Sequence, residues 1–239
     1  MRQLILLAAL LLWLAPATAG EPPEQVHLAT NALGDGMVVQ WGTAEATTLL
    51  CSSASDIEYG PDPDSLNLSA SGSWEMYDWT TCVHTVELSG LAPNSTYHYR
   101  VGGVANDTPR HSRPAAFSTL KPSGPVKLLL LGDTGRGNLI QHKFATLLRR
   151  EQPDAVMIAG DIVYPSFTPK YEDFRHFSVY REHMKSTPYF TAVGNHDLYD
   201  GDTAYLNAFH LPTNNLPTLG LKNPTVDYPF SGTEHFYSF

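Results

Sequence analysis

The feature that most constrains this chain is a pattern repeated three times in its C-terminal half. An apolar run ends in a glycine, and a polar residue follows: residues 126–131 lead to Asp133, residues 155–159 to Asp161 and residues 189–193 to Asn195. Apolar runs of this kind are typical of strands in a parallel sheet that are covered on both faces. The pattern therefore predicts three such strands, each of which delivers a polar side chain to a loop.

The segments between these strands have a helical character. Ile140, Phe144, Leu147 and Leu148 fall on one face of a helix that ends at Arg149 and Arg150, and residues 171–185 form a second candidate helix. The order β-α-β-α-β predicts a parallel sheet with right-handed crossovers.

Ligands of open parallel sheets bind where the strands end, so the three loops are expected to converge. Each motif alone is compatible with an ordinary turn, a helix cap or a core tyrosine, but the ordered triplet favours a metal site. Carboxylate, phenol, amide and imidazole groups suit hard or borderline cations such as Fe(III), Fe(II), Mn(II) and Zn(II). The candidate residues are Asp133, Asp161, Tyr164, Asn195 and His196.

The N-terminal half has short alternating runs separated by turn residues, which predicts a small β-sandwich. The segment LSGLAPNSTYHYRVGG (88–103) resembles a fibronectin type III module, in which Leu91 and Tyr97 would pack in the core. We expect this all-β domain at residues 20–119, a linker at 120–125 and the α/β domain at 126–239.

Residues 1–19 resemble a cleaved signal peptide, with Arg2, an apolar core and a small-x-small pattern at residues 17–19. An uncleaved membrane anchor is the alternative. Export favours a disulfide between Cys51 and Cys82, and the alternative is that both are buried free thiols. Three glycosylation sequons agree with a secreted protein, and a lysosomal or vacuolar one is also compatible. They begin at Asn67, Asn94 and Asn106.

The charge balance argues against some partners. The chain carries 15 basic and 24 acidic residues, a formal charge of −9, and lacks a basic run. We therefore expect no binding to nucleic acid, and none to membranes after signal cleavage.

The blocks GDTG, GDIVY and GNHD resemble those of the purple acid phosphatases, within the calcineurin-like metallophosphoesterases. The tyrosine of the second block separates that family from other metallophosphoesterases. The resemblance implies that Asp133 and Tyr164 bind Fe(III), that Asp161 bridges both metals, and that Asn195 binds a divalent Zn, Mn or Fe. His196 would contact the phosphate or protonate the leaving alcohol, and a metal-bound hydroxide would attack phosphorus.

Two departures from the family pattern stand out. Asp197 occupies a position where the family often has glutamate. The two later blocks that supply histidine ligands do not occur, because His210 and His235 match neither pattern. We therefore expect a truncated family member, with an apolar sheet face left uncovered and little phosphatase activity by itself.

Three functions stay open at this point. The first is an acid phosphatase that hydrolyses small phosphate monoesters, and a homodimer is compatible with it. The second is a metallophosphoesterase acting on diesters or nucleotides. The third is a non-catalytic secreted glycoprotein that binds a partner through its sandwich.

Overall fold

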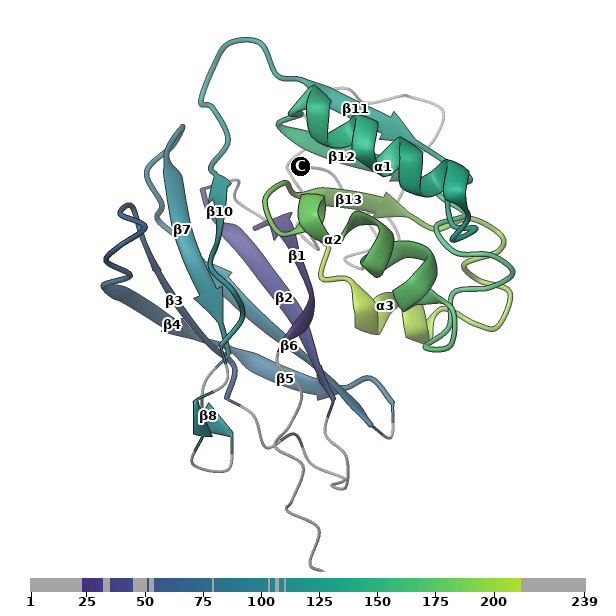
Figure 1. Cartoon of the computed structure of the whole chain (residues 1–239), viewed down its shortest axis with the longest axis horizontal. Helices are drawn as coiled ribbons and strands as arrows, with labels where there is room; N and C mark the ends of the chain where they lie inside the picture. Colours follow the sequence, from purple (N-terminus) through teal and green to yellow (C-terminus); the bar gives the residue numbers. More distant parts are fainter. Residues whose placement is uncertain are drawn as a thin grey trace, which may run out of the picture.

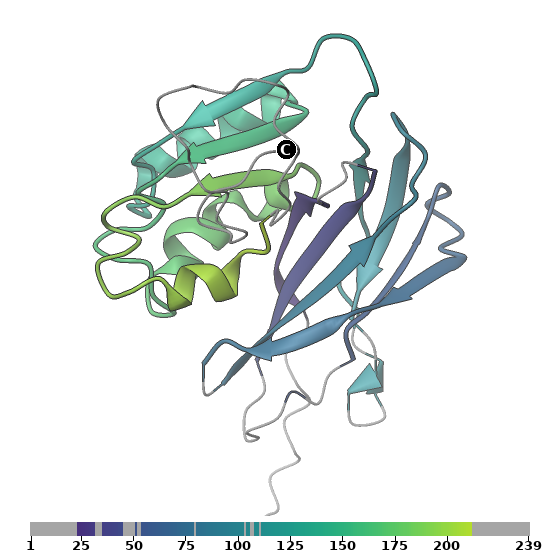
Figure 2. The same ribbon diagram turned by 180° about the vertical axis from the view of Figure 1, so that it is seen from behind.

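The computed structural model describes residues 23–31, 35–44, 51, 54–78, 80–102, 104–105, 108–109 and 111–211. In this part of the chain, a sheet-rich N-terminal domain precedes an α/β region (Figures 1 and 2). The predicted order of the two fold types is confirmed. The predicted leader and Asn106 lie outside the described residues.

The N-terminal domain consists of two four-stranded sheets, in which all paired strands are antiparallel. Their inward faces share one core, to which Leu91 and Tyr97 contribute as expected. One sheet contains β1 (Glu24–Thr30), β2 (Met37–Ala44), β6 (Thr81–Leu88) and β5 (Ser73–Met76), and the other β10 (Ala115–Ser118), β7 (Thr96–Val101), β3 (Asp56–Gly60) and β4 (Leu68–Ser71). A small hairpin pairs β8 (Val104–Ala105) with β9 (Thr108–Pro109).

The predicted disulfide and two of the predicted glycosylation sites lie in this domain. Cys51 and Cys82 form a disulfide, with their Cα atoms 5.8 Å apart and 31 residues of separation in the chain. The disulfide attaches the segment before β3 to the central strand β6. Asn67 and Asn94 are both exposed, as glycan acceptors must be.

The α/β region contains a parallel sheet of three strands in the order β11-β12-β13. Helices α1 and α2 lie on one face of this sheet, in front of the strands in Figure 1 and behind them in Figure 2. The predicted second helix is present but divided, because a π-helical turn, η1 (Asp173–Phe177), precedes α2 (Ser178–Met184). The other elements are β11 (Leu128–Leu131), α1 (Leu139–Glu151), β12 (Ala155–Ala159), β13 (Tyr189–Ala192) and α3 (Thr203–Ala208).

The prediction that the first of these strands is covered on both faces is wrong. Along β11, Leu131 is buried, whereas Leu128 and Leu130 are 48% and 71% exposed. The physical reason is that α1 and α2 pack on one face of the sheet, so the alternate side chains of β11 point away from them. This exposure agrees with the expected uncovered face.

The predicted buried stripe of α1 is also wrong in most of its positions. Ile140 is 76% exposed, and the buried residues are Gln141, Ala145 and Leu148. The Gln141 side chain accepts a hydrogen bond from the Gly137 amide at 2.5 Å and donates to the Arg175 carbonyl at 2.7 Å. These bonds satisfy a polar side chain inside the protein, so the helix presents the Gln141 row to its neighbours.

The two domains pack directly against each other. Leu28 of β1 forms a parallel bridge with Pro188, next to β13, and the Tyr99 hydroxyl donates to the Lys185 carbonyl at 2.7 Å. The His27 ring lies 5.1 Å from that of Phe177. The sandwich therefore supports α2 and β13 from one side. None of the described helices is both long and apolar enough to cross a membrane.

Candidate metal centre

Asp133 and Asp161 lie at the ends of β11 and β12, in backbone conformations that few non-glycine residues adopt. Their φ angles are 56° and 51°, in the left-handed region where short polar side chains are tolerated best. A Cβ atom at Gly135 would lie 1.8 Å from the Ile162 carbonyl oxygen, so only glycine permits this approach of the two loops. The strand exits are therefore shaped to bring the two carboxylates together.

Tyr164 joins the two carboxylates. Its hydroxyl oxygen lies 2.8 Å from Oδ1 of Asp133 and 2.8 Å from Oδ2 of Asp161. Loss of solvation, together with these hydrogen bonds to carboxylates, raises the pKa of the Tyr164 phenol. Without a cation, the phenol thus keeps its proton and shares it with the carboxylates. A bound cation would replace that proton as the partner of all three oxygens.

The third loop places His196 beside the same group. Its backbone N–H donates to Oδ1 of Asp161 at 3.1 Å, and its ring centroid lies 4.5 Å from that of Tyr164. Nδ1 lies 2.7 Å from the carbonyl oxygen of Pro165, which can only accept, so Nδ1 carries a proton. The Nε2 atom is then the one left for chemistry. Asn195, directly before His196, is exposed on the same loop.

Asp197 is completely buried and ties the second and third loops together. One carboxylate oxygen accepts from the amides of Ile162 and Val163 at 2.9 and 3.2 Å, and the other from the Gly194 amide at 2.9 Å. Burial raises the pKa of Asp197, and the three hydrogen bonds oppose that effect. The sequence interpretation treated this residue only as a departure from a pattern and missed its structural role. The signal available was the acid that ends the third block, GNHD.

Two arginines surround Tyr164, and the sequence interpretation missed both. Arg175, on η1, donates a hydrogen bond from its guanidinium to the Tyr164 carbonyl oxygen. Arg136, three residues after Asp133, places its guanidinium carbon 4.6 Å from the centre of the Tyr164 ring. Neither contact has a sequence signature, because both depend on how separate loops meet.

The donor set fits a hard cation, although it is small. Within the described residues, no three His, Cys, Asp or Glu side chains are grouped so as to hold a metal ion. What converges is two carboxylates and a phenol, and such oxygen donors match the preferences of Fe(III). His210 is elsewhere: its amide donates to Gln40 of β2 at 2.6 Å, in the sandwich. His235 lies outside the described residues.

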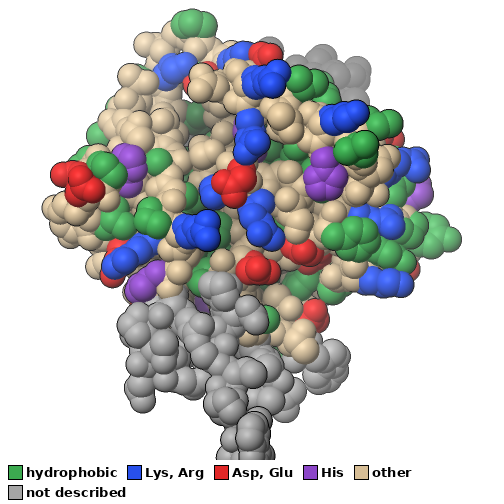
Figure 3. Space-filling model, viewed as in Figure 1, with side chains coloured by type: hydrophobic (Ala, Val, Ile, Leu, Met, Phe, Trp, Pro, Cys, Tyr) green, Lys and Arg blue, Asp and Glu red, His purple; other side chains and the backbone are tan. Residues whose placement is uncertain are grey.

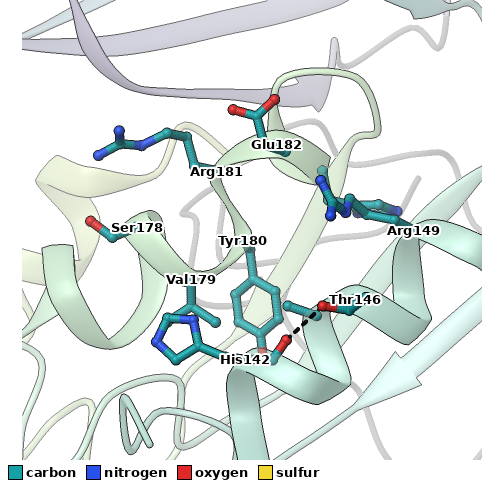
Figure 4. A pocket seen from close by; sticks show the side chains of 10 residues that line it. His142, Thr146, Arg149, Ser178, Val179, Tyr180, Arg181 and Glu182 are labelled. Atoms are coloured by element: carbon teal, nitrogen blue, oxygen red, sulfur yellow. Dashed lines mark hydrogen bonds between the residues drawn. The ribbon is translucent and has the colours of Figure 1, made fainter. Parts of the chain in front are cut away.

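A groove of about 430 Å³ between α1 and α2 is separate from this centre (Figure 4). It is lined by His142, Arg149 and His183 among others, and by none of the predicted site residues. Burial, helped by the positive charge of Arg149, lowers the pKa of His183 to about 4. The groove therefore does not contain a second copy of the predicted metal site.

Comparison with known proteins places the chain in a family. Residues 126–235 match the calcineurin-like phosphoesterase domain, which is the class that the fold and the strand-end site define. Residues 23–119 match the N-terminal domain of purple acid phosphatases. Together the two domains show that the chain belongs to the purple acid phosphatase family, and the expected enzyme class, a phosphatase, is confirmed at the level of the family.

Individual relatives agree with this assignment. The chain is 29% identical over 216 residues to acid phosphatase type 7 of Homo sapiens. The aligned region covers 84% of this chain and 45% of that protein. It is 26% identical over 182 residues to purple acid phosphatase 21 of Arabidopsis thaliana, covering 74% of this chain and 38% of the relative. A purple acid phosphatase from yellow lupin seeds has the same fold, with a TM-score of 0.67 at 20% identity over 81% of this chain and 41% of that one. The chain thus spans less than half the length of these proteins.

Proposed function

We propose that the protein is an acid phosphatase that hydrolyses phosphate monoesters with the help of a dinuclear Fe(III)–M(II) centre, where M is Zn, Mn or Fe. The observation that carries this proposal is the Tyr164 hydroxyl, 2.8 Å from both strand-end carboxylates. A phenol in that position supports an iron site rather than a site of carboxylates alone, because phenolate is a strong ligand for a trivalent ion.

The proposal assigns each donor a role. Asp133 and Tyr164 would hold the ferric ion, Asp161 would bridge the two metals, and Asn195 would hold the divalent ion. The bridging role suits Asp161, because its carboxylate already contacts both the Tyr164 hydroxyl and the His196 amide. The metals, when bound, supply Lewis acidity that activates water and neutralises charge on the phosphate.

His196 would orient the substrate and move a proton. The Pro165 carbonyl holds Nδ1 and fixes the ring beside Tyr164. A protonated Nε2 can therefore donate to a phosphoryl oxygen or to the leaving alcohol.

The test is Tyr164→Phe in the full-length protein, with Tyr199→Phe as the matched control, because Tyr199 is 77% exposed near the third loop. The parent protein should contain iron, absorb visible light through phenolate-to-iron charge transfer and hydrolyse an aryl phosphate at acid pH. Tyr164→Phe should abolish the absorption band, and Tyr199→Phe should preserve it. A Tyr164→Phe protein that kept both its iron and its colour would contradict the ligand assignment.

A further inference from the structure

Arg136 is a cation at the predicted metal centre whose charge no described carboxylate neutralises. It follows the first block directly and is exposed, and its guanidinium carbon lies 4.6 Å from the centre of the Tyr164 ring. The hydroxyl of that ring lies 2.8 Å from both Asp133 and Asp161. The guanidinium therefore lies against the same tyrosine whose hydroxyl contacts the two carboxylates.

Comparison with Arg175 shows what distinguishes Arg136. Arg175 donates to the Tyr164 carbonyl, and its guanidinium also stacks on Tyr171 and Phe174. Its role is to hold the loop. Arg136, in contrast, forms no ion pair with a described carboxylate, although Asp133 is only three residues away.

The hydrogen-bond donors of Arg136 are available, because its guanidinium donates to no protein acceptor among the described residues. A guanidinium is planar, and its five N–H groups lie in that plane. Contact with an aromatic ring occupies its face through a cation–π interaction and restricts its motion. A guanidinium with free donors is a fork of the kind that binds carboxylate or phosphate oxygens in pairs.

We propose that Arg136 is a specificity-determining residue that binds the terminal oxygens of a phosphate monoester. This inference rests on the proposed phosphatase function. A monoester phosphate has three terminal oxygens, and a diester has one fewer because a second oxygen carries a substituent. An additional guanidinium fork beside the centre therefore favours the monoester over the diester.

The experiment uses the full-length, metal-loaded protein and three variants. Arg136→Gln removes the charge and the fork, Arg136→Lys keeps the charge alone, and Arg150→Gln removes an exposed arginine at the end of α1 as a control. Binding of inorganic phosphate is measured by calorimetry. Hydrolysis of an aryl phosphate and of a bis-aryl phosphate is measured in parallel, together with iron content.

Arg136→Gln should weaken phosphate binding by about tenfold, as expected for loss of charged hydrogen bonds. KM for the monoester should rise by a similar factor, while the diester changes less than about twofold. For Arg136→Lys, phosphate affinity and KM should lie between those of the parent and those of Arg136→Gln, because a point charge cannot bind two oxygens as a fork. Arg150→Gln should match the parent, and iron content should stay constant throughout.

Equal losses for both substrates, unchanged phosphate binding, or loss of iron in Arg136→Gln would each overturn the role of Arg136. These results are distinct from failure of the proposed function. If the parent protein with full metal content hydrolysed neither substrate, the phosphatase proposal would fall, and the assignment of Arg136 with it.

Discussion

The sandwich and the α/β region differ in how completely they bury their own apolar side chains. In the described part of the sandwich, the exposed large hydrophobic residues are Leu68 and Trp74, on β4 and β5. The α/β region exposes many more, and Figure 3 shows hydrophobic side chains gathered at the right-hand edge, toward the carboxyl ends of the strands. The exposed large hydrophobic residues of the described α/β region are Val126, Leu128, Leu130, Leu139, Ile140, Phe144, Leu147, Phe174, Leu198 and Tyr199.

For the strand residues, the difference follows from the number of layers in each region. Each sheet of the sandwich turns one face toward the other sheet, so the inward side chains of both are covered. The three-stranded parallel sheet has α1 and α2 on one face. Strands with apolar residues on both faces need two covering layers, so a single helical layer leaves side chains such as Leu130 in solvent.

The two regions also differ in what fixes their loops. In the sandwich, a disulfide holds the segment before β3 to β6. In the α/β region, one buried carboxylate, Asp197, accepts three backbone hydrogen bonds from two loops. Asp197 thus holds the second and third site loops to each other through backbone hydrogen bonds.

The strongest test of this contrast is Asp197→Ala. Loss of the carboxylate leaves three buried N–H groups without an acceptor, and the expected cost is about 3–5 kcal/mol of unfolding free energy. Asp200→Ala, an exposed neighbour on the same segment, should change the stability by less than about 0.5 kcal/mol. Urea unfolding measures both. Equal stabilities for the two variants would show that Asp197 does not hold the loops.

A smaller effect is expected where the two domains meet, at His176. This side chain is fully buried among Phe177, Tyr180, Tyr189 and Phe209, and neither ring nitrogen has a described partner. Burial, with a contribution from His27, lowers its pKa from 6.5 to about 3. Between these values the unfolded chain binds a proton that the folded chain does not, so stability falls as the pH falls below the unfolded pKa.

Between about pH 7.5 and pH 5, His176 should cost the parent protein about 2 kcal/mol of unfolding free energy. The His176→Phe variant should not show this part of the loss. Burial raises the pKa of Glu172, so this residue contributes to the pH dependence of stability with the opposite sign. Because Glu172 is present in both proteins, the comparison with the parent isolates the effect of His176. His142→Phe, at an exposed position of α1, is the control. The measurement is the unfolding free energy as a function of pH. An unchanged slope in His176→Phe would contradict the buried, neutral imidazole.

The smallest effect concerns the exposed row of α1. Ile140→Ser should change the unfolding free energy of the 239-residue chain by less than about 0.5 kcal/mol, because Ile140 is 76% exposed. Leu148→Ala, on the buried row, should cost about 2–5 kcal/mol. Thermal or urea unfolding distinguishes them. A large loss for Ile140→Ser would mean that the row first predicted from the sequence is buried after all.

The sequence by itself determined the order of the elements, the parallel sheet and the identity of the strand-end residues. These features are local, because an apolar run, a glycine and the next polar residue are covalent neighbours. For the same reason Asp133, Asp161 and Tyr164 could be named before their contact was known, and the structure then brings their oxygens together.

The tertiary structure alone decided which side chains face inward and which groups surround the site. Helix α1 has two rows that could pack, and the Gln141 row is buried because Gly137 and Arg175 satisfy its amide. Asp197 binds an amide 35 residues away in the chain, and Arg136 stacks on the side chain of Tyr164, which follows a different strand. Such contacts depend on the position of separate backbone segments, and no local pattern of residues encodes that position.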